Sequence, residues 1–331
     1  MAELICGVDL GGTKIAVALV DAAGRIHRKE VIRGHRGKGE DAIVAAIAEA
    51  VGRLCAVEGI GEVEHPDGRL EPTELLGIGV GTSGHVDCRR GVVVTNSNLP
   101  GFTDYPLQRT LQEHFDVPVV IDNDANAQAY AEFCFGAGRD APNMVFVTVS
   151  TGIGAGIIMD SRLYRGVNGT AGEIGHTIVN PHSTIRCGCG NYGCLMAHAS
   201  GLALAQVVRE KLAGGRYAGS IDLKSLQDHE ITGEVIKRGM DAGDPLCREI
   251  VTEYADYLAI GLHNLYQSFN PGLIVLGGGL TEWGPVYLER VEERFYELAR
   301  EMMYERVEVR LSELGADAAV LGAAALMLEP V

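Results

Sequence analysis

The chain has 331 residues, of which 47% are hydrophobic, and its formal net charge at pH 7 is −16. This length is enough for two domains with separate hydrophobic cores. The strong negative charge argues against nucleic acid or an anionic membrane as a partner, although backbone N–H groups can still bind a phosphate ligand.

The N-terminal sequence and the cysteines favour a reducing compartment. The sequence has no apolar run long enough to span a bilayer, and its first residues lead into a strand pattern without the layout of a signal peptide. Several of the cysteines are scattered and show no disulfide framework, namely Cys6, Cys55, Cys88, Cys134 and Cys247. We therefore expect a cytoplasmic protein.

Apolar periodicity predicts strands mixed with helices, and hence an α/β protein. In chain order, we expect strands at 4–9 and 15–20, a helix at 42–54, strands at 76–81 and 117–121, and a helix at 123–135. Strands at 144–149 and 155–159, a long amphipathic helix over 250–265 and a strand at 273–276 follow.

A glycine turn, G-V-D-L-G-G-T-K at residues 7–14, separates the first two expected strands. Its residues Gly11, Gly12, Thr13 and Lys14 can direct backbone N–H groups at phosphate oxygens, because glycine permits close approach. Asp9 is a candidate for holding a hydrated Mg²⁺ ion. Lys14 is not a P-loop lysine, since the surrounding G-x-x-x-x-G-K pattern is absent.

A second glycine turn, S-T-G-I-G-A-G at residues 150–156, lies in the same context in the middle of the chain. Thr151, Gly152 and Gly154 are its candidate phosphate contacts. Two such units predict two related domains that face one another across a cleft. A later triple glycine, which contains Gly278 and Gly279, either leaves room for an adenine base or forms a simple turn. A single glycine hairpin is usually only a tight turn, so the phosphate interpretation depends on all three segments together.

A polar segment, D-N-D-A-N at residues 122–126, follows an expected strand and opens an expected helix. Carboxylates at such strand ends lie where open α/β sheets bind ligands. Asp124 can accept a proton from a substrate hydroxyl, and Asn123 can hydrogen-bond a neighbouring hydroxyl. The alternative is that these residues only cap the helix. Asp122 and Asn126 are the better candidates for a purely structural role.

One imidazole and three thiols lie close together in the sequence, at His176, Cys187, Cys189 and Cys194. This set predicts a closed, tetrahedral structural zinc site. A disulfide or free thiols are the alternatives, but two cysteines separated by one residue rarely close a relaxed disulfide. Glu173 precedes His176 by three residues, so the metal should also order the surroundings of this carboxylate.

Together, the motifs G-V-D-L-G-G-T-K, D-N-D-A-N, T-G-I-G-A-G, N-G-T-A-G-E-I-G-H and C-G-C-G-N-Y-G-C resemble the ROK family (repressor, open reading frame, kinase), over nearly the whole chain. The resemblance implies a two-lobed, actin-like fold of the ribonuclease H-like, hexokinase type. It also implies a glucokinase-like kinase that uses ATP and Mg²⁺ and phosphorylates a sugar. The expected lobes are residues 1–121, completed by a C-terminal helix near 317–329, and residues 122–316 with the zinc loop at 176–194.

The resemblance also implies roles for individual residues. Asp124 would be the catalytic base, and Gly84 matches the loop that lies against the substrate. The implied sugar contacts are Asn98, Asn123, Glu173 and His176, with His176 binding zinc through one nitrogen and facing the sugar with its other side. Family members are usually dimers, so we expect a homodimer or a higher homo-oligomer. ROK repressors carry a DNA-binding segment before the first glycine turn, and with only six residues before Gly7 we expect an enzyme.

One position departs from the family pattern. Glucose-phosphorylating members have G-C-L-E at the last zinc cysteine, and the glutamate binds sugar hydroxyls; this chain has Met196 there. Methionine cannot accept those hydrogen bonds in the same way. Either water or His198 compensates, or the substrate is an amino sugar, a deoxy sugar or a cyclitol. A polyphosphate donor and a non-catalytic sugar-binding sensor remain further alternatives.

Overall fold

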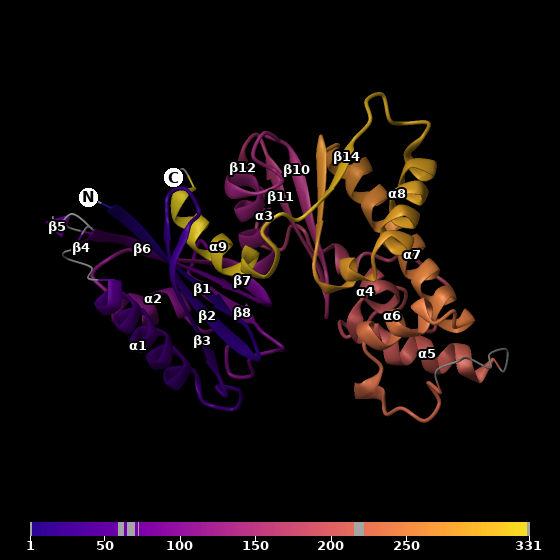
Figure 1. Ribbon diagram of the computed structural model, residues 1–331, viewed down its shortest axis with the longest axis horizontal. Coiled ribbons are helices and arrows are strands. Elements are labelled where there is room, and N and C mark those ends of the chain that lie inside the picture. The colour runs from indigo at the N-terminus through magenta and orange to yellow at the C-terminus, as the bar shows by residue number, and fades with distance from the viewer. Residues whose placement is uncertain (1, 59–62, 65–69, 72, 215–221, 330–331) are drawn as a thin grey trace. The chain divides into compact units, whose positions relative to one another are not determined.

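The structure is a computed structural model that describes residues 2–58, 63–64, 70–71, 73–214 and 222–329 (Figure 1). Its strands are β1 (Ala2–Leu10), β2 (Lys14–Asp21), β3 (Ile26–Arg33), β4 (Val63–Glu64), β5 (Leu70–Glu71), β6 (Thr73–Thr82), β7 (His85–Asp87), β8 (Val92–Thr95), β9 (Val119–Asn123), β10 (Met144–Val149), β11 (Ile153–Met159), β12 (Arg162–Leu163), β13 (Leu273–Gly277) and β14 (Glu308–Leu311). Its α-helices are α1 (Glu40–Glu58), α2 (Leu107–Gln112), α3 (Asp124–Phe135), α4 (Leu195–Ala199), α5 (Leu204–Ala213), α6 (Gly233–Asp241), α7 (Pro245–Phe269), α8 (Pro285–Ala299) and α9 (Ala318–Ala325).

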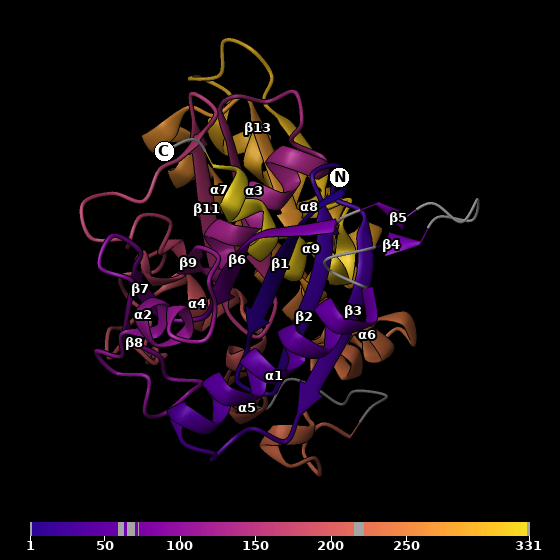
Figure 2. The same cartoon turned by 90° about the vertical axis from the view of Figure 1, so that its left-hand side faces the viewer.

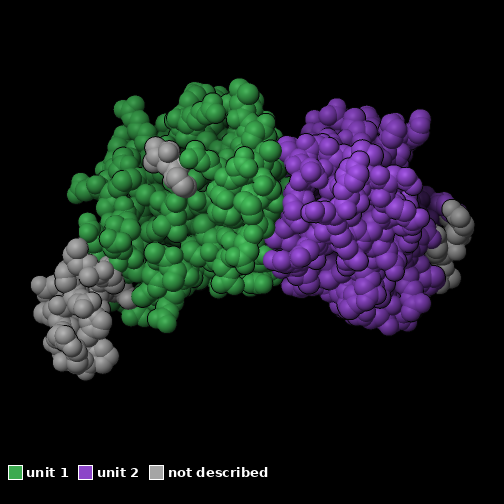
Figure 3. Space-filling view, turned by 90° about the horizontal axis from the view of Figure 1, so that it is seen from above, with its two compact units in different colours: residues 1–146, 156–172, 312–331 green, residues 147–155, 173–311 purple. Residues whose placement is uncertain are grey.

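The chain divides into two compact units (Figure 3). Unit 1 contains residues 1–146, 156–172 and 312–331, and unit 2 contains residues 147–155 and 173–311. Unit 1 therefore includes α3 and α9, whereas the sequence analysis placed its lobe boundary before α3. The helix expected near 317–329 is α9. The two-lobe division at residues 121 and 122 stays a prediction.

The sheet of unit 1 has the strand order β3-β2-β1-β6-β9. Strand β2 is antiparallel to both β1 and β3, whereas β1, β6 and β9 run parallel to one another. In the register of the parallel strands, Asp9 pairs with Gly81, and Gly81 pairs with Asp122. The carboxyl ends of three neighbouring strands therefore meet at one edge of the sheet.

Helices cover both faces of this sheet. Successive side chains of a strand point to opposite faces, and along β1 from Leu4 to Val8 both sets are apolar and buried. On β1, Leu4, Cys6 and Val8 belong to the apolar cluster that includes Ile43 and Ile47 of α1. The intervening Ile5 belongs instead to the cluster of α9, which includes Val320 and Ala324. Figure 2 shows α1 in front of β2 and β3, and the yellow α9 behind the sheet.

Two glycines let α9 approach the sheet closely. A Cβ atom at Gly7 would lie 2.1 Å from the Val320 carbonyl oxygen, and one at Gly79 would lie 1.8 Å from that of Ala323. Any side chain at these positions would displace the helix backbone. The first glycine of the G-V-D-L-G-G-T-K motif thus serves packing, and Gly11 and Gly12 remain as candidates for ligand contact.

The second sheet has the order β12-β11-β10-β13-β14, with β13 and β14 parallel. In unit 2, the long helix α7 packs against α4, α6 and α8. The Asp244 carboxylate caps the start of α7, and Asn270 ends the helix in the left-handed conformation at φ 45°. Among the described residues, no helix combines the length and the apolar character that a membrane crossing needs.

The strands and helices predicted from periodicity are confirmed as β1, β2, α1, β6, β9, α3, β10, β11, α7 and β13. Two differences are small. Strand β9 begins at Val119, after the proline at 118, and α3 begins at Asp124 because Asn123 is its N-cap. Half-exposed strands such as β3 and short elements such as β7, β8 and β12 were not predicted, since they lack a clear apolar period.

Candidate active site and metal centre

The carboxyl ends of β1, β6 and β9 carry most of the candidate residues of unit 1. Strand β1 leads into the first glycine turn, β6 leads into Gly84, and β9 leads into Asp124. This is the edge of an α/β sheet where ligands bind. The parallel register brings the three segments side by side, because Leu10 pairs with Thr82 and Thr82 pairs with Asn123.

Asp124 is the first residue of α3, and the capping role belongs to its neighbour. The Asn123 Oδ1 atom accepts hydrogen bonds from the backbone N–H groups of Ala125 and Asn126 at 2.8 and 3.4 Å. Asp124 Oδ1 also accepts from the Ala125 N–H at 2.9 Å. The positive end of the helix dipole favours a negative charge at this position. The Asn123 Nδ2 atom donates to the Gly84 carbonyl at 3.0 Å, which ties two predicted sugar contacts together.

A buried ion pair braces the turn that carries Asp124. The Asp122 side chain is only 3% exposed, and its Oδ2 accepts from Arg165 Nε at 2.6 Å. Its Oδ1 accepts from the Asn123 N–H at 2.7 Å and from Asn126 Nδ2 at 3.0 Å. Arg165 also makes a two-pronged contact with Glu329 near the C-terminus. These contacts match the structural role predicted for Asp122 and Asn126.

Replacing Arg165 with Met is expected to lower the free energy of unfolding by about 3–5 kcal/mol, because Asp122 and Glu329 would keep buried or half-buried charges without a partner. Urea unfolding measures this change. The matched control is Arg139→Met, which removes an exposed pair with Glu313 and should cost less than about 1 kcal/mol. Equal losses in the two variants would contradict the bracing role.

Two hydrogen bonds hold the first glycine turn in place. The Gly11 N–H donates to the Lys14 carbonyl at 3.1 Å, and the Thr82 hydroxyl donates to the Leu10 carbonyl at 3.1 Å. Thr13 and Lys14 are exposed. Burial raises the pKa of Asp9, while the charges of Lys14 and Lys29 oppose this rise. A bound divalent cation would also favour the charged carboxylate, so Asp9 fits the predicted magnesium role.

Asn98 lies against this turn. A Cβ atom at Gly12 would be 2.8 Å from the Asn98 carbonyl oxygen, so only glycine fits there. Gly84 has a φ of 91°, and a Cβ atom there would meet the Thr95 carbonyl oxygen at 2.2 Å. Asn98 Nδ2 donates to the Ser83 hydroxyl at 3.2 Å.

A buried asparagine that the sequence analysis missed holds this region together. Asn96 Oδ1 accepts from the N–H groups of Asn98 and Leu99 at 3.0 and 3.2 Å, and Asn96 Nδ2 donates to the Ser83 carbonyl at 2.7 Å. Thr82 ends the strand β6 and Ser83 follows it, so the strand-end argument used for 122–126 would have found them. The contacts of Asn96 with Asn98 and Leu99 are local, but its contact with Ser83 comes from another segment, and the sequence does not record it.

In unit 2, the second glycine turn, Gly278 and Met196 lie together. The Ser150 N–H donates to the Gly152 carbonyl at 2.8 Å within the turn. Gly278 has a φ of 93°, and a Cβ atom there would be 2.5 Å from the Val149 carbonyl oxygen. The thioether sulfur of Met196 accepts from the Ile153 N–H at 3.3 Å. Met196 also touches the segment after Glu173, since a Cβ atom at Gly175 would be 2.8 Å from its Cε.

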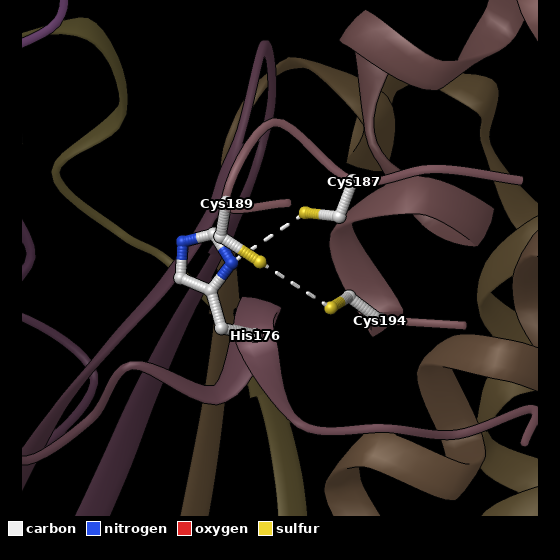
Figure 4. Close-up of side chains that lie close together, drawn as sticks. All are labelled: His176, Cys187, Cys189 and Cys194. Carbon is white, nitrogen blue, oxygen red and sulfur yellow. Dashed lines mark hydrogen bonds between the residues drawn. The ribbon is translucent and has the colours of Figure 1, made fainter. Parts of the chain in front are cut away.

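The four predicted zinc ligands converge in unit 2 (Figure 4). Their ligand atoms all lie within 4.8 Å of one another. His176 Nδ1 is 3.6 Å from the Cys187 sulfur, and the Cys189 and Cys194 sulfurs are 3.7 Å apart. A tetrahedral zinc site with ordinary bond lengths has edges of about 3.6 Å between nitrogen and sulfur and about 3.8 Å between sulfurs. The donor set therefore fits a structural zinc ion, and all four donors would be used.

The local fold explains how these ligands meet. Short bridges pair Ile178 with Cys194 and Arg186 with Tyr192, which folds the loop back on itself. Gly193 has a φ of 75°, and a Cβ atom there would meet the Asn180 carbonyl oxygen at 1.9 Å. The disulfide alternative does not hold, because all three cysteines are free. Burial raises the pKa of the Cys194 thiol to about 12, so a metal cation is what would favour its thiolate.

The two nitrogens of His176 have different neighbours. Nδ1 faces the cysteine sulfurs, whereas Nε2 lies 3.9 Å from the Glu173 carboxylate. Glu173 therefore lies next to the ring nitrogen that a metal would leave free, where partners commonly orient a liganding histidine.

The candidate residues thus fall into two groups, one in each unit. Unit 1 holds Asp9, Gly11, Gly12, Thr13, Lys14, Gly84, Asn98, Asn123 and Asp124. Unit 2 holds Thr151, Gly152, Gly154, Glu173, His176, Cys187, Cys189, Cys194, Met196, Gly278 and Gly279. In unit 1 the contacts described above join Gly11 to Lys14, Gly12 to Asn98, and Gly84 to Asn123, and in unit 2 they join Glu173 to the four predicted zinc ligands. A cleft between the units stays a prediction.

Comparisons with known proteins agree with these arrangements. The model of the ROK family matches residues 5–329. A glucokinase of Halalkalibacterium halodurans is 33% identical, over 96% of this chain and 92% of its own length. A xylose repressor of Caldicellulosiruptor bescii is 31% identical, over 98% of this chain and 78% of its own length. The crystal structure of a ROK family glucokinase from Streptomyces griseus in complex with glucose and AMPPNP is 31% identical, with a TM-score of 0.76 over 98% of both chains.

Proposed function

The chain belongs to the ROK family and has its α/β, actin-like ATPase fold, and we propose that it is an ATP-dependent sugar kinase. The reaction would transfer the γ-phosphoryl group of ATP to a hydroxyl group of a hexose or a hexose-like substrate. The observation that carries this proposal is the position of Asp124, which starts α3 at the sheet edge that also carries the first glycine turn. The relatives named glucokinase and the neighbour with glucose and AMPPNP support the reaction class.

Asp124 would act as the general base in this reaction. Its carboxylate would take the proton of the attacking hydroxyl while that oxygen bonds to the γ-phosphorus and ADP leaves. Most of the rate in such transfers comes from positioning and from charge stabilisation. The positive end of the α3 dipole favours a negative charge at Asp124, and the Arg165–Asp122 pair keeps its backbone in place.

The two glycine turns would hold the phosphates of ATP through backbone N–H groups. Asp9 would hold a hydrated Mg²⁺ ion, which neutralises phosphate charge when it is bound. In unit 2, the residues that would contact the phosphates are Thr151, Gly152 and Gly154. Gly278 packs closely against the end of β10, and the neighbouring Gly279 would leave room for a flat adenine base.

The sugar would be held by polar side chains from both groups, namely Asn98, Asn123, Glu173 and His176, with Gly84 against the ring. The hydrogen bonds that fix Asn98 and Asn123 support this role, because contact residues must be preorganised to discriminate among hydroxyl groups. A structural zinc ion at His176 and the three cysteines would order the loop that presents Glu173.

A second candidate substrate class follows from Met196. Its sulfur is engaged with the Ile153 N–H, and its methyl group packs beside Gly175. The side chain therefore offers an apolar surface where glucose-phosphorylating members have a carboxylate. An amino sugar or a deoxy sugar would lack one of the paired hydroxyls that such a carboxylate binds, and a cyclitol would lack the anomeric centre. These substrates are the alternative to glucose.

A coupled assay of ADP release identifies the substrate. Wild-type protein and Met196→Glu are compared on glucose, mannose, glucosamine, N-acetyl sugars and cyclitols, with Met196→Leu as the control that keeps an apolar side chain. If Met196 sets specificity, wild type turns over a substrate other than glucose, and Met196→Glu gains glucose activity by about 10²-fold or more. Strong glucose turnover by wild type would instead show that Met196 is tolerated in a glucokinase.

The same assay separates an enzyme from a sensor. A non-catalytic sensor would bind sugar without releasing ADP, and the xylose repressors among the relatives make this alternative worth testing. Measuring the sugar phosphate formed with polyphosphate in place of ATP tests the donor. The expected homodimer or higher homo-oligomer and the cytoplasmic location stay predictions.

A further inference from the structure

His35 is a buried histidine that the proposed mechanism does not use. It follows β3 and is only 2% exposed. Its Nε2 atom lies 2.8 Å from the carbonyl oxygen of Gly11 in the first glycine turn. A carbonyl oxygen can only accept a hydrogen bond, so Nε2 carries the proton and donates it. The other ring nitrogen, Nδ1, is buried and has no hydrogen-bonding partner among the described residues.

This hydrogen bond determines which way one peptide group of the turn points. In a trans peptide, the carbonyl oxygen and the following N–H group point in opposite directions. The described residues contain no cis peptide bond. Because the Gly11 carbonyl points to the buried His35, the Gly12 N–H points away from it.

The preceding peptide group, between Leu10 and Gly11, is fixed in a similar way. The Leu10 carbonyl accepts from the Thr82 hydroxyl at 3.1 Å, and the Gly11 N–H donates to the Lys14 carbonyl at 3.1 Å. The two peptide groups that lead into Gly12 therefore each have a set orientation. Glycine has no side chain that would hinder rotation of the peptide groups on either side of it. Without these hydrogen bonds, the two peptide groups would therefore be free to flip.

Packing alone does not account for a histidine at this position. A buried nitrogen without a partner is unfavourable, and an apolar side chain of similar size would avoid it. What histidine provides, and an apolar residue does not, is the Nε2–H donor to Gly11. Both the neutral and the protonated ring can keep this donor, so the contact does not depend on the charge of His35.

We propose that His35 is a positioning residue for the nucleotide, which holds the Gly11 carbonyl inward so that the Gly12 N–H faces the phosphates. This inference rests on the proposed function, since it requires the first glycine turn to bind a nucleotide. A preorganised N–H group avoids the cost of reorienting the peptide when the phosphate arrives.

The test compares His35→Met, which removes the donor, with His35→Gln, whose Nε2 is the same number of bonds from Cα and can still donate. The control is His263→Met in unit 2, where Nδ1 is likewise buried without a partner. His35→Met is expected to raise the KM for ATP about tenfold and to weaken AMPPNP binding equally. The KM for the sugar at saturating ATP should stay within about twofold of wild type, and His35→Gln should restore most of the nucleotide affinity.

Three outcomes would overturn the inference. One is an unchanged KM for ATP in a folded His35→Met protein, and another is an equal rise in the KM values for ATP and for sugar. The third is a His35→Gln protein that is as impaired as His35→Met although its melting temperature equals that of wild type. AMPPNP binding to wild type without ADP release would contradict the kinase proposal alone, because binding to the variants would still decide the role of His35. If wild type bound no AMPPNP, both proposals would fail.

Discussion

Asp124→Asn is expected to lower the kcat of sugar phosphorylation by about 10²–10⁴-fold, because an amide cannot take the proton of the attacking hydroxyl. The substitution keeps the shape of the side chain and an oxygen that can accept from the Ala125 N–H. Helix α3 should therefore begin as before, and sugar binding should persist. Steady-state kinetics measure kcat, and calorimetric titration measures the sugar affinity.

The control for this prediction is Asp140→Asn, which changes an exposed aspartate of the same unit and should leave kcat within about twofold of wild type. Turnover by Asp124→Asn at the wild-type rate would exclude Asp124 as the base. A variant that had lost both sugar binding and turnover would show that the Asp124 carboxylate is needed to form the site rather than to take the proton.

Cys189→Ser is expected to abolish binding of one zinc ion per chain and to lower the free energy of unfolding by several kcal/mol, because binding to a structural zinc site is coupled to folding. Cys189 is suited to this test because it is exposed, and serine at an exposed site removes little packing. The loss of stability would then measure what the bound zinc ion contributes to folding. Elemental analysis counts the zinc, and thermal unfolding measures the stability.

Cys247→Ser provides the matched control, because Cys247 is buried in the same unit but lies outside the cluster. It should lose stability through packing and retain its zinc. The turnover of Cys189→Ser should also fall, since the loop that presents Glu173 would no longer be ordered. A zinc-free Cys189→Ser protein with full activity would show that the cluster does not support the site.

Features that depend on neighbours in the chain could be predicted from the sequence. The strands β1, β2, β10 and β11 and their glycine turns follow from apolar periodicity interrupted by glycine. The zinc ligands follow from their donor types and short spacing, and the position of Asp124 follows from a strand that leads directly into a helix. These inferences hold because the relevant residues are close in sequence and local geometry constrains them.

The structure alone decided how distant segments support those features. Arg165 reaches Asp122 across 43 positions and Glu329 across 164, and His35 reaches Gly11 across 24. Asn96, which follows β8, donates a hydrogen bond to the carbonyl oxygen of Ser83, which follows β6. A lone arginine, asparagine or histidine in a sequence is usually a surface residue, and only folding shows which ones are buried with a partner.

The sequence by itself therefore determined the family, the glycine turns, the base candidate and the metal ligands, since each is a short-range pattern of residue types. Tertiary structure decided that Asn123 caps α3 while Asp124 opens it, that Met196 is engaged with the Ile153 N–H, and that buried donors orient the first glycine turn. The physical reason is that a buried polar group must find its partner wherever the fold supplies one, and chain order does not record that proximity.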